Sequence, residues 1–187
     1  MGTILLRLGP RQTEAVSFVG SGRVVGVVVA LVILCAGLPA CDTSAAAACG
    51  PITVDPLDPN ESHLLAGTSG VPTFSQNPPT SGPHIAGAVS RGVQHRVLTG
   101  VEQVSTLETG AVIVQYGAIS SAVRTRLEAE AADAIVVAPG AKLPAAIVAT
   151  GWQRTMRCDR YDASALQAFI ATVQGRYNAH TATASGS

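Results

Sequence analysis

Hydrophobic and polar positions divide the chain into three stretches. An uncharged apolar run, VVGVVVALVILCAGL, fills residues 24–38. Residues 50–100 show no sustained period and hold 7 of the 11 prolines, which remove backbone donors and interrupt both strands and helices. From residue 101 the apolar positions recur with the periods of strands and helices. The pattern therefore predicts a long irregular segment followed by a region of regular structure.

Apolar segments after residue 100 predict four strands and two amphipathic helices. The strands are expected at residues 101–107 (an edge strand), 111–116, 135–138 and 145–152. One helix is expected to begin at Ser120 or Ser121, either of which can cap it, and to run to about residue 132. The second is capped by Asp162, has apolar residues at i, i+3, i+4 and i+7, and ends before Gly175.

These elements follow one another in the order β-β-α-β-β-α. The strand–helix–strand unit over residues 111–138 predicts two parallel strands. The short link at 139–144 predicts an antiparallel hairpin between the strands that it joins. We therefore expect an α+β (or α/β) fold, in which two helices pack on one face of a small mixed β-sheet after a long Pro/Gly-rich irregular segment. The single domain should span residues 50–177, with a flexible tail at 178–187.

The apolar run has the length and the flanks of a secretory signal peptide. Three arginines precede it, and its 15 residues would span about 22 Å as a helix, short of the ~30 Å core of a bilayer. The sequence Leu-Pro-Ala-Cys that ends at Cys41 resembles a bacterial lipobox. We therefore predict a lipoprotein leader at 1–40, lipidation of Cys41 and a tether at 41–49; an uncleaved anchor and full secretion are the alternatives. All three place the domain outside the cytoplasm, and a lipid would hold it at the extracytoplasmic face of the cell membrane.

The four cysteines fit an oxidising compartment. Cys35 would leave with the leader and Cys41 would carry the lipid, so Cys49 and Cys158 remain as an even pair. We predict that these two form a disulfide. Metal binding by cysteine is the alternative, although the chain has no C-x-x-C spacing.

The charge balance excludes one class of partner. The chain has 12 Lys+Arg and 12 Asp+Glu, so its formal net charge is zero. Nucleic-acid-binding proteins usually carry an excess of basic residues, so we expect no nucleic-acid partner. With 47% hydrophobic and 13% charged residues, the composition is that of a globular domain.

Two stretches combine polar side chains with a rigid or buried setting. In NPPTSGPH (residues 77–84), two prolines fix the turn that presents Thr80, Ser81 and His84. Glu108 comes shortly before the buried strand at 111–116, where it could act as a ligand, a base or a hydrogen-bond anchor. These four side chains are the predicted ligand-binding residues. The alternative is structural: the hydroxyls and the carboxylate would satisfy nearby backbone groups in stiff loops.

Three motifs together resemble a known bacterial family. NPPTSGPH, LETGAVIVQY about 30 residues later, and the ATGW…RCDRYD segment are similar to the family called domain of unknown function 3105. The likeness covers roughly residues 49–176. His63 also begins a stretch, HLLAG, that resembles a His-Val-x-x-Gly stretch of the family. The resemblance implies an exported or membrane-anchored protein without an assigned activity.

The chain departs from the family at one motif. Many members read His-Ser-Leu-Glu-His-Gly where this chain has Ser-Thr-Leu-Glu-Thr-Gly, so Ser105 and Thr109 replace two histidines. In the fuller form, that pair and the counterparts of His63 and His84 would make a His-rich metal site. This chain retains His63, His84 and Glu108 as candidate ligands for a divalent metal such as copper or zinc.

The sequence leaves three functions open. The neutral charge, the membrane tether and the missing histidine pair favour a structural or interaction module of the cell envelope. The alternative is a protein that binds a metal ion or small ligand through His63, His84 and Glu108. A hydrolase with Ser81 as nucleophile, His84 as base and Glu108 as orienter has the least support, because the chain has no G-x-S-x-G elbow.

Overall fold

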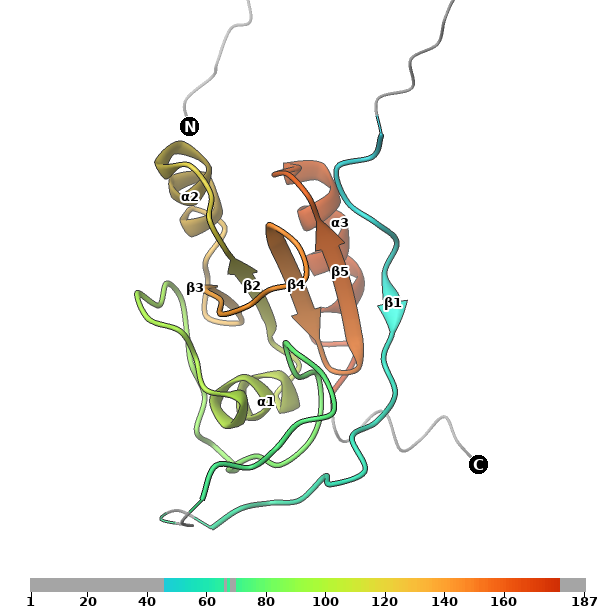
Figure 1. The fold of residues 1–187 in the computed structure, drawn as a ribbon, viewed down its shortest axis with the longest axis vertical. Helices are drawn as coiled ribbons and strands as arrows, with labels where there is room; N and C mark the ends of the chain where they lie inside the picture. Colours follow the sequence, from blue (N-terminus) through green and yellow to red (C-terminus); the bar gives the residue numbers. More distant parts are fainter. Residues whose placement is uncertain (1–45, 66, 68–69, 179–187) are drawn as a thin grey trace, which may run out of the picture. The chain divides into compact units, whose positions relative to one another are not determined.

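A computed structural model describes residues 46–65, 67 and 70–178, which form a five-stranded mixed sheet with three helices (Figure 1). The elements in chain order are β1 (Thr53–Val54), α1 (Gly100–Glu108), β2 (Val112–Tyr116), α2 (Ser121–Glu128), β3 (Ile135–Pro139), β4 (Ile147–Gly151), β5 (Arg154–Cys158) and α3 (Ala163–Val173). The fold is therefore α+β, as predicted. The predicted leader, the Cys41 lipidation site and almost all of the predicted tail lie outside the described residues.

The sheet has the strand order β1-β5-β4-β2-β3. Strands β2 and β3 are parallel, as the strand–helix–strand pattern predicted, and the other neighbours are antiparallel. The predicted hairpin between β3 and β4 is wrong. The link crosses the end of β2, where Gly140 N donates to Tyr116 O and Gly117 N donates to Ala146 O, both at 2.9 Å. Strand β4 thereby pairs with the free edge of β2, whose buried backbone groups need partners on both sides.

The antiparallel hairpin lies instead between β4 and β5, which the sequence analysis missed. Its register pairs Gly151 with Arg154, so the turn consists of Trp152 and Gln153. Gln153 has φ of 52°, a conformation that suits a tight turn and that few non-glycine residues adopt. The predicted strand at 145–152 is therefore shorter than expected, and the chain reverses at its end.

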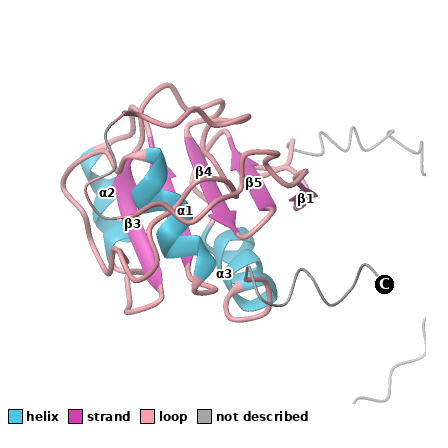
Figure 2. Ribbon diagram, turned by 90° about the horizontal axis from the view of Figure 1, so that it is seen from below, coloured by secondary structure: helices cyan, strands magenta, loops and turns pink. Residues whose placement is uncertain are grey.

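Helices cover both faces of the sheet (Figure 2). Alternate residues of β2 point to opposite faces, so Val112 and Val114 pack with Leu127 of α2 and Phe169 of α3. Ile113 packs on the other face with the buried residues of α1. The prediction of two helices on one face holds for α2 and α3, while α1 adds a layer that the sequence did not predict.

The prediction of an edge strand at 101–107 is wrong, because this segment forms helix α1. Thr99 caps the helix: its side chain accepts from Glu102 N at 3.2 Å, and the Glu102 carboxylate accepts from Thr99 N at 2.8 Å. This reciprocal capping box satisfies two backbone donors that a helix start leaves unpaired. The β-branched residues of the segment favour a strand only weakly, so the cap and the packing against the sheet decide the conformation.

The other two helix starts are confirmed. The Ser120 side chain accepts from Val123 N, and the Asp162 side chain accepts from Ala165 N. Helix α2 ends at Glu128, earlier than the predicted residue 132. Helix α3 ends at Val173, and Gly175 after it has φ of 69°, the left-handed conformation expected after a helix C-terminus.

The segment before α1 is irregular, as predicted, and a disulfide fastens its beginning to the sheet. The Cys49–Cys158 bond, with an S–S length of 2.09 Å, confirms the predicted pairing. Beyond it, β1 pairs with β5 over only two residues. No helix in the described part of the chain is long and apolar enough to cross a membrane.

Candidate metal site

The segment NPPTSGPH (residues 77–84), called the Pro-rich loop below, is anchored at several points before it reaches His84. Asn77 precedes a cis peptide bond, and its Nδ2 donates to Ala141 O at 3.3 Å and to Lys142 O at 3.0 Å. Thr80 Oγ1 donates to a carboxylate oxygen of Asp55 at 3.2 Å. These contacts fix the loop against the link between β3 and β4 and against the segment after β1.

Thr80 and Ser81 are buried and already hydrogen-bonded. Thr80 Oγ1 also accepts from Gln76 Nε2, and Ser81 Oγ accepts from Asp58 N at 2.9 Å. Their relative exposures are 0% and 1%. The structure gives both hydroxyls a role in holding the loop, and ligand binding by them stays a prediction.

A short backbone pairing brings the two histidines together. His84 N donates to Ser62 O at 3.0 Å, and Leu64 N donates to His84 O at 2.7 Å. This parallel bridge places His63 beside His84, with ring centroids 4.6 Å apart and ring planes at 80°. Two segments separated by 20 residues thus present their imidazoles at one point.

Glu108 reaches the same point from the last residue of α1. Its Oε1 lies 3.4 Å from His63 Nε2 and 3.4 Å from His84 Nε2. The last turn of α1 carries no basic residue. A carboxylate at a helix C-terminus faces the negative end of the helix dipole, so its placement there calls for a cation beside it.

The hydrogen bonding of His84 determines which nitrogen faces Glu108. Nδ1 lies 2.7 Å from Gly82 O, and because a carbonyl can only accept, Nδ1 carries the proton. Gly82 has φ of 124°, which glycine adopts at little cost. In the neutral ring, Nε2 therefore presents a lone pair, and it is buried without a hydrogen-bond partner. This arrangement, with one nitrogen donating to a carbonyl and the other free, is typical of a metal-ligating histidine.

The site is closed on one side and open on the other. The His84 side chain is 2% exposed and that of Glu108 is 10% exposed, whereas that of His63 is 65% exposed. Trp152 forms part of the closed side, with its ring centroid 6.0 Å from that of His84 at an interplanar angle of 83°. A bound ion would therefore be held from the protein interior and would reach solvent past His63.

The structure brings together the three predicted metal ligands. One ligand atom from each of His63, His84 and Glu108 lies within 4.8 Å of the other two. It does not assemble the hydrolase arrangement: the Ser81 hydroxyl is bonded to Asp58 N, while the His84 nitrogens face Gly82 O and Glu108. His63 and His84 are 45 and 24 residues before Glu108, so only the family resemblance could group them in advance.

Of the two positions where the family has histidine, Ser105 lies on α1, and Thr109 directly follows Glu108 as the C-cap of that helix. Ser105 Oγ accepts from Ile85 N at 3.0 Å and donates to Val101 O at 2.7 Å, and the residue is fully buried. Its contact with Ile85 shows that this face of α1 is turned toward the His84 segment. Thr109 is four residues further along, one turn on, and is exposed.

Comparison with known proteins identifies one family. The model of the family described as "Protein of unknown function (DUF3105)" matches residues 68–186. The matched region includes His84 and Glu108, whereas His63 precedes it. No curated protein and no solved structure matches the chain.

Proposed function

The chain belongs to the DUF3105 family of proteins of unknown function, and we propose that its domain binds a divalent transition-metal ion through His63, His84 and Glu108. The observation that carries the proposal is the buried Nε2 of His84, which has no hydrogen-bond partner and lies 3.4 Å from Glu108 Oε1. If His84 Nε2 carries no proton, its lone pair and the carboxylate oxygen repel each other at this distance. A cation between them turns the repulsion into two bonds.

The two His–Glu spacings, though not the spacing of all three ligand atoms, fit a small ion. Two ligands bonded at 2.0–2.1 Å to a tetrahedral metal lie about 3.3–3.4 Å apart. Both His–Glu distances are 3.4 Å. The ligand atoms as a set lie within 4.8 Å of one another, which is wider than one ion can span, so one side chain must close in. His63 can do so because it is largely exposed.

The donor set narrows the choice of metal. Two imidazoles and one carboxylate suit Zn²⁺ or Cu²⁺, whereas Ca²⁺ and Mg²⁺ prefer all-oxygen sites and Cu⁺ prefers sulfur ligands. Three protein ligands leave at least one position for water or for a ligand from another molecule. Together with the exposed His63, this supports an exchangeable metal rather than a permanently enclosed structural one.

The proposal is tested by measuring metal binding to the full wild-type chain and to variants of the proposed ligands. We expect native mass spectrometry to show one Zn²⁺ or Cu²⁺ per chain, and His84→Gln and Glu108→Gln each to weaken binding at least about tenfold, the usual effect of losing one good interaction. His95→Gln is the matched control, because His95 is an exposed histidine outside the cluster. Equal metal adducts in wild type, His84→Gln and His95→Gln would overturn the proposal.

Trp152 provides an independent readout of the site. It is the only tryptophan of the chain, and its ring centroid is 6.0 Å from that of His84. Cu²⁺ quenches tryptophan emission at short range, so Cu²⁺ at this site should quench the fluorescence of wild type at one equivalent. Zn²⁺ should compete and restore the emission. Quenching that persists in His84→Gln would place the copper elsewhere.

We also propose that the domain works outside the cytoplasm, held at the membrane by a lipid on Cys41. The Cys49–Cys158 disulfide is compatible with an oxidising compartment and supports this location weakly. The experiment is fractionation of cells producing the full chain with and without Cys41→Ala. The wild-type chain is expected in the membrane fraction with a lipid-sized mass increase, and a mass without lipid would contradict the proposal.

A structural or interaction role in the cell envelope is the competing proposal. The neutral charge and the replaced histidines at Ser105 and Thr109 support it. The metal experiments separate the two functions. If wild type binds neither metal, crosslinking in intact cells followed by identification of the partner becomes the experiment that tests the envelope role.

A further inference from the structure

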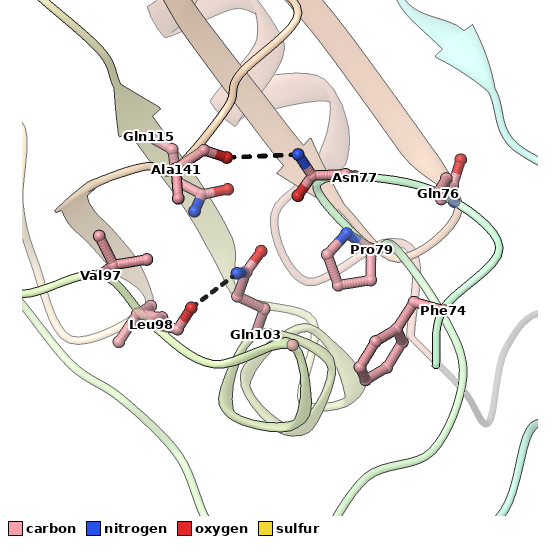
Figure 3. Close-up of a pocket in the computed structure, with 10 residues that line it drawn as sticks. Phe74, Gln76, Asn77, Pro79, Val97, Leu98, Gln103, Gln115 and Ala141 are labelled. Atoms are coloured by element: carbon pink, nitrogen blue, oxygen red, sulfur yellow. Dashed lines mark hydrogen bonds between the residues drawn. The ribbon is translucent and has the colours of Figure 1, made fainter. Parts of the chain in front are cut away.

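A pocket outside the candidate metal site is lined in part by the Pro-rich loop. A pocket of about 300 Å³ opens between this loop, the start of α1 and β2 (Figure 3). None of the three candidate metal ligands lines it. The pocket is therefore separate from the proposed metal site, although NPPTSGPH contributes to both.

Two buried glutamine side chains point into this pocket (Figure 3). Gln103 is 5% exposed and Gln115 is 1% exposed. Gln103 Nε2 donates to Leu98 O at 3.0 Å, which fixes the orientation of the amide and leaves Oε1 to face the pocket. The Oε1 atoms of both residues are buried and lack a hydrogen-bond partner. Buried acceptors are seldom left unpaired, so the pocket calls for a molecule with N–H or O–H donors.

Gln115 offers more than an acceptor. Its amide has no hydrogen bond to any residue of the described chain, so its Nε2 is also available as a donor. An acceptor and a donor side by side on one planar group match a primary amide, which can form two hydrogen bonds to it in a ring. The remaining N–H of such a ligand would be free to reach Gln103 Oε1.

The rest of the lining selects an uncharged molecule with an apolar body. No charged residue of the described chain lines the pocket, and Phe74, Pro79, Val97 and Leu98 supply apolar surface beside Gln76 and Asn77. The ring of Phe74 lies against Gly100, where a Cβ atom would be only 2.2 Å from Phe74 Cε2. Glycine at the start of α1 thus allows this aromatic wall to form. A charged ligand would lose its hydration without gaining a counter-charge.

We propose that this pocket binds a small, uncharged primary amide with an aromatic or apolar body, which pairs with Gln115 and donates to Gln103. Pockets that combine apolar walls with a few convergent polar groups are typical ligand sites. The site requires no metal and is independent of the proposed metal function.

Benzamide is the probe for the test, with two close analogues as controls. We expect benzamide to shift the side-chain amide signals of Gln103 and Gln115 in ¹⁵N-resolved NMR spectra of the full chain. N,N-dimethylbenzamide lacks the N–H donors and benzoate carries a charge, so both should bind at least tenfold more weakly. Equal binding of the three compounds, or no shift with benzamide up to its solubility, would overturn the proposal.

Variants place the binding in this pocket. Gln115→Leu removes the unpaired amide at nearly constant volume, and benzamide affinity should fall at least tenfold. Gln167→Leu, on the exposed surface of α3, is the matched control and should bind as wild type does. Glu108→Gln should also keep benzamide binding, because it alters only the metal site. If Gln115→Leu fails to fold, the comparison of the three compounds on wild type decides; unchanged affinity in a folded Gln115→Leu would contradict the proposal.

Discussion

At the scale of single residues, Asp55 holds the Pro-rich loop to the sheet. Its Oδ2 accepts from Thr80 Oγ1 at 3.2 Å and from Thr155 Oγ1 at 2.5 Å, and the residue is 8% exposed. Asp55→Ala would leave two buried hydroxyls without this acceptor. We expect it to lower the free energy of unfolding by about 2–3 kcal/mol in urea titrations, since each orphaned buried group costs about 1–3 kcal/mol.

The same substitution should reach the candidate metal site. Thr80 is four residues before His84, so a loosened loop should present His84 less rigidly and bind metal more weakly. Asp133→Ala is the control, because Asp133 is an exposed aspartate outside the loop. A chain with Asp55→Ala that is as stable as the control would show that the loop is held by its other contacts.

Thr109 is the residue at which the family pattern can be restored. It is exposed and directly follows Glu108, so a larger side chain can enter there without disturbing the core. We expect Thr109→His to supply a fourth ligand and to tighten Zn²⁺ binding at least about tenfold in calorimetric titrations. Ser105→His is not equivalent, because Ser105 is fully buried and accepts from Ile85 N. Thr109→Gln controls for bulk, and equal affinities of the two Thr109 variants would contradict the expectation.

At the scale of elements, Glu102 makes the start of α1 sensitive to pH. Hydrogen bonds from the Arg96 guanidinium, supported by those from Thr99 and partly opposed by burial, lower the pKa of Glu102 from 4.5 to about 2. A lowered pKa means that the stabilisation is complete above pH 4.5 and is lost as the pH falls toward 2. Because Glu102 is only partly buried and solvent screens its charge, we expect the carboxylate to contribute about 1 kcal/mol rather than the full value of the shift.

Glu102→Gln tests this contribution. The variant should be about 1 kcal/mol less stable than wild type at pH 7, and the difference should shrink between pH 4.5 and 2, as measured by chemical unfolding. Glu61→Gln provides an exposed control on the segment before α1. A difference that stays constant over this pH range would show that the carboxylate's charge does not stabilise the helix start.

Elements whose signals are local could be predicted from the sequence. The caps Ser120 and Asp162 and the apolar strand at 111–116 are confirmed within a few residues. Helix α1 was missed although its capping box, Thr99-Gly-Val-Glu102, is visible in the sequence, because its β-branched residues resemble a strand. The partner of β4 depends on which edge of β2 is free, and that is a property of the whole sheet.

The two candidate sites also differ in how far the sequence could predict them. The metal ligands could be grouped in advance because the family motifs mark His84 and Glu108 and a weaker likeness marks His63. The glutamine pocket could not be predicted in advance. Gln103 lies in α1 and Gln115 in β2, and the hydrophobic pattern of these segments indicates how they pack, not that they line a pocket. Only the structure shows that both amides point into one space (Figure 3).

At the scale of the whole molecule, the disulfide fastens the irregular segment to the sheet. Cys49 and Cys158 are 109 residues apart in sequence, and closing a loop of this length contributes about 5 kcal/mol in the chain-entropy model. The segment around Cys49 adds backbone bonds from Gly50 N to Arg157 O at 2.8 Å and from Asp159 N to Ala48 O at 2.9 Å. Together with the two-residue strand β1, these contacts cover the outer edge of β5.

Cys49→Ala should therefore do more than lower stability. We expect a loss of about 5 kcal/mol in the free energy of unfolding, and the same loss in wild type treated with reductant. Because β1 is too short to hold the segment alone, the amides of Gly50 and Asp159 should exchange hydrogen much faster, and the edge of β5 should become available for pairing between molecules. Hydrogen exchange measures the first effect, and light scattering measures the second.

Reductant provides the control, because it should change the stability and the exchange of Cys49→Ala no further. If the reduced wild type keeps its stability and slow exchange, β1 and the backbone bonds suffice to cover β5.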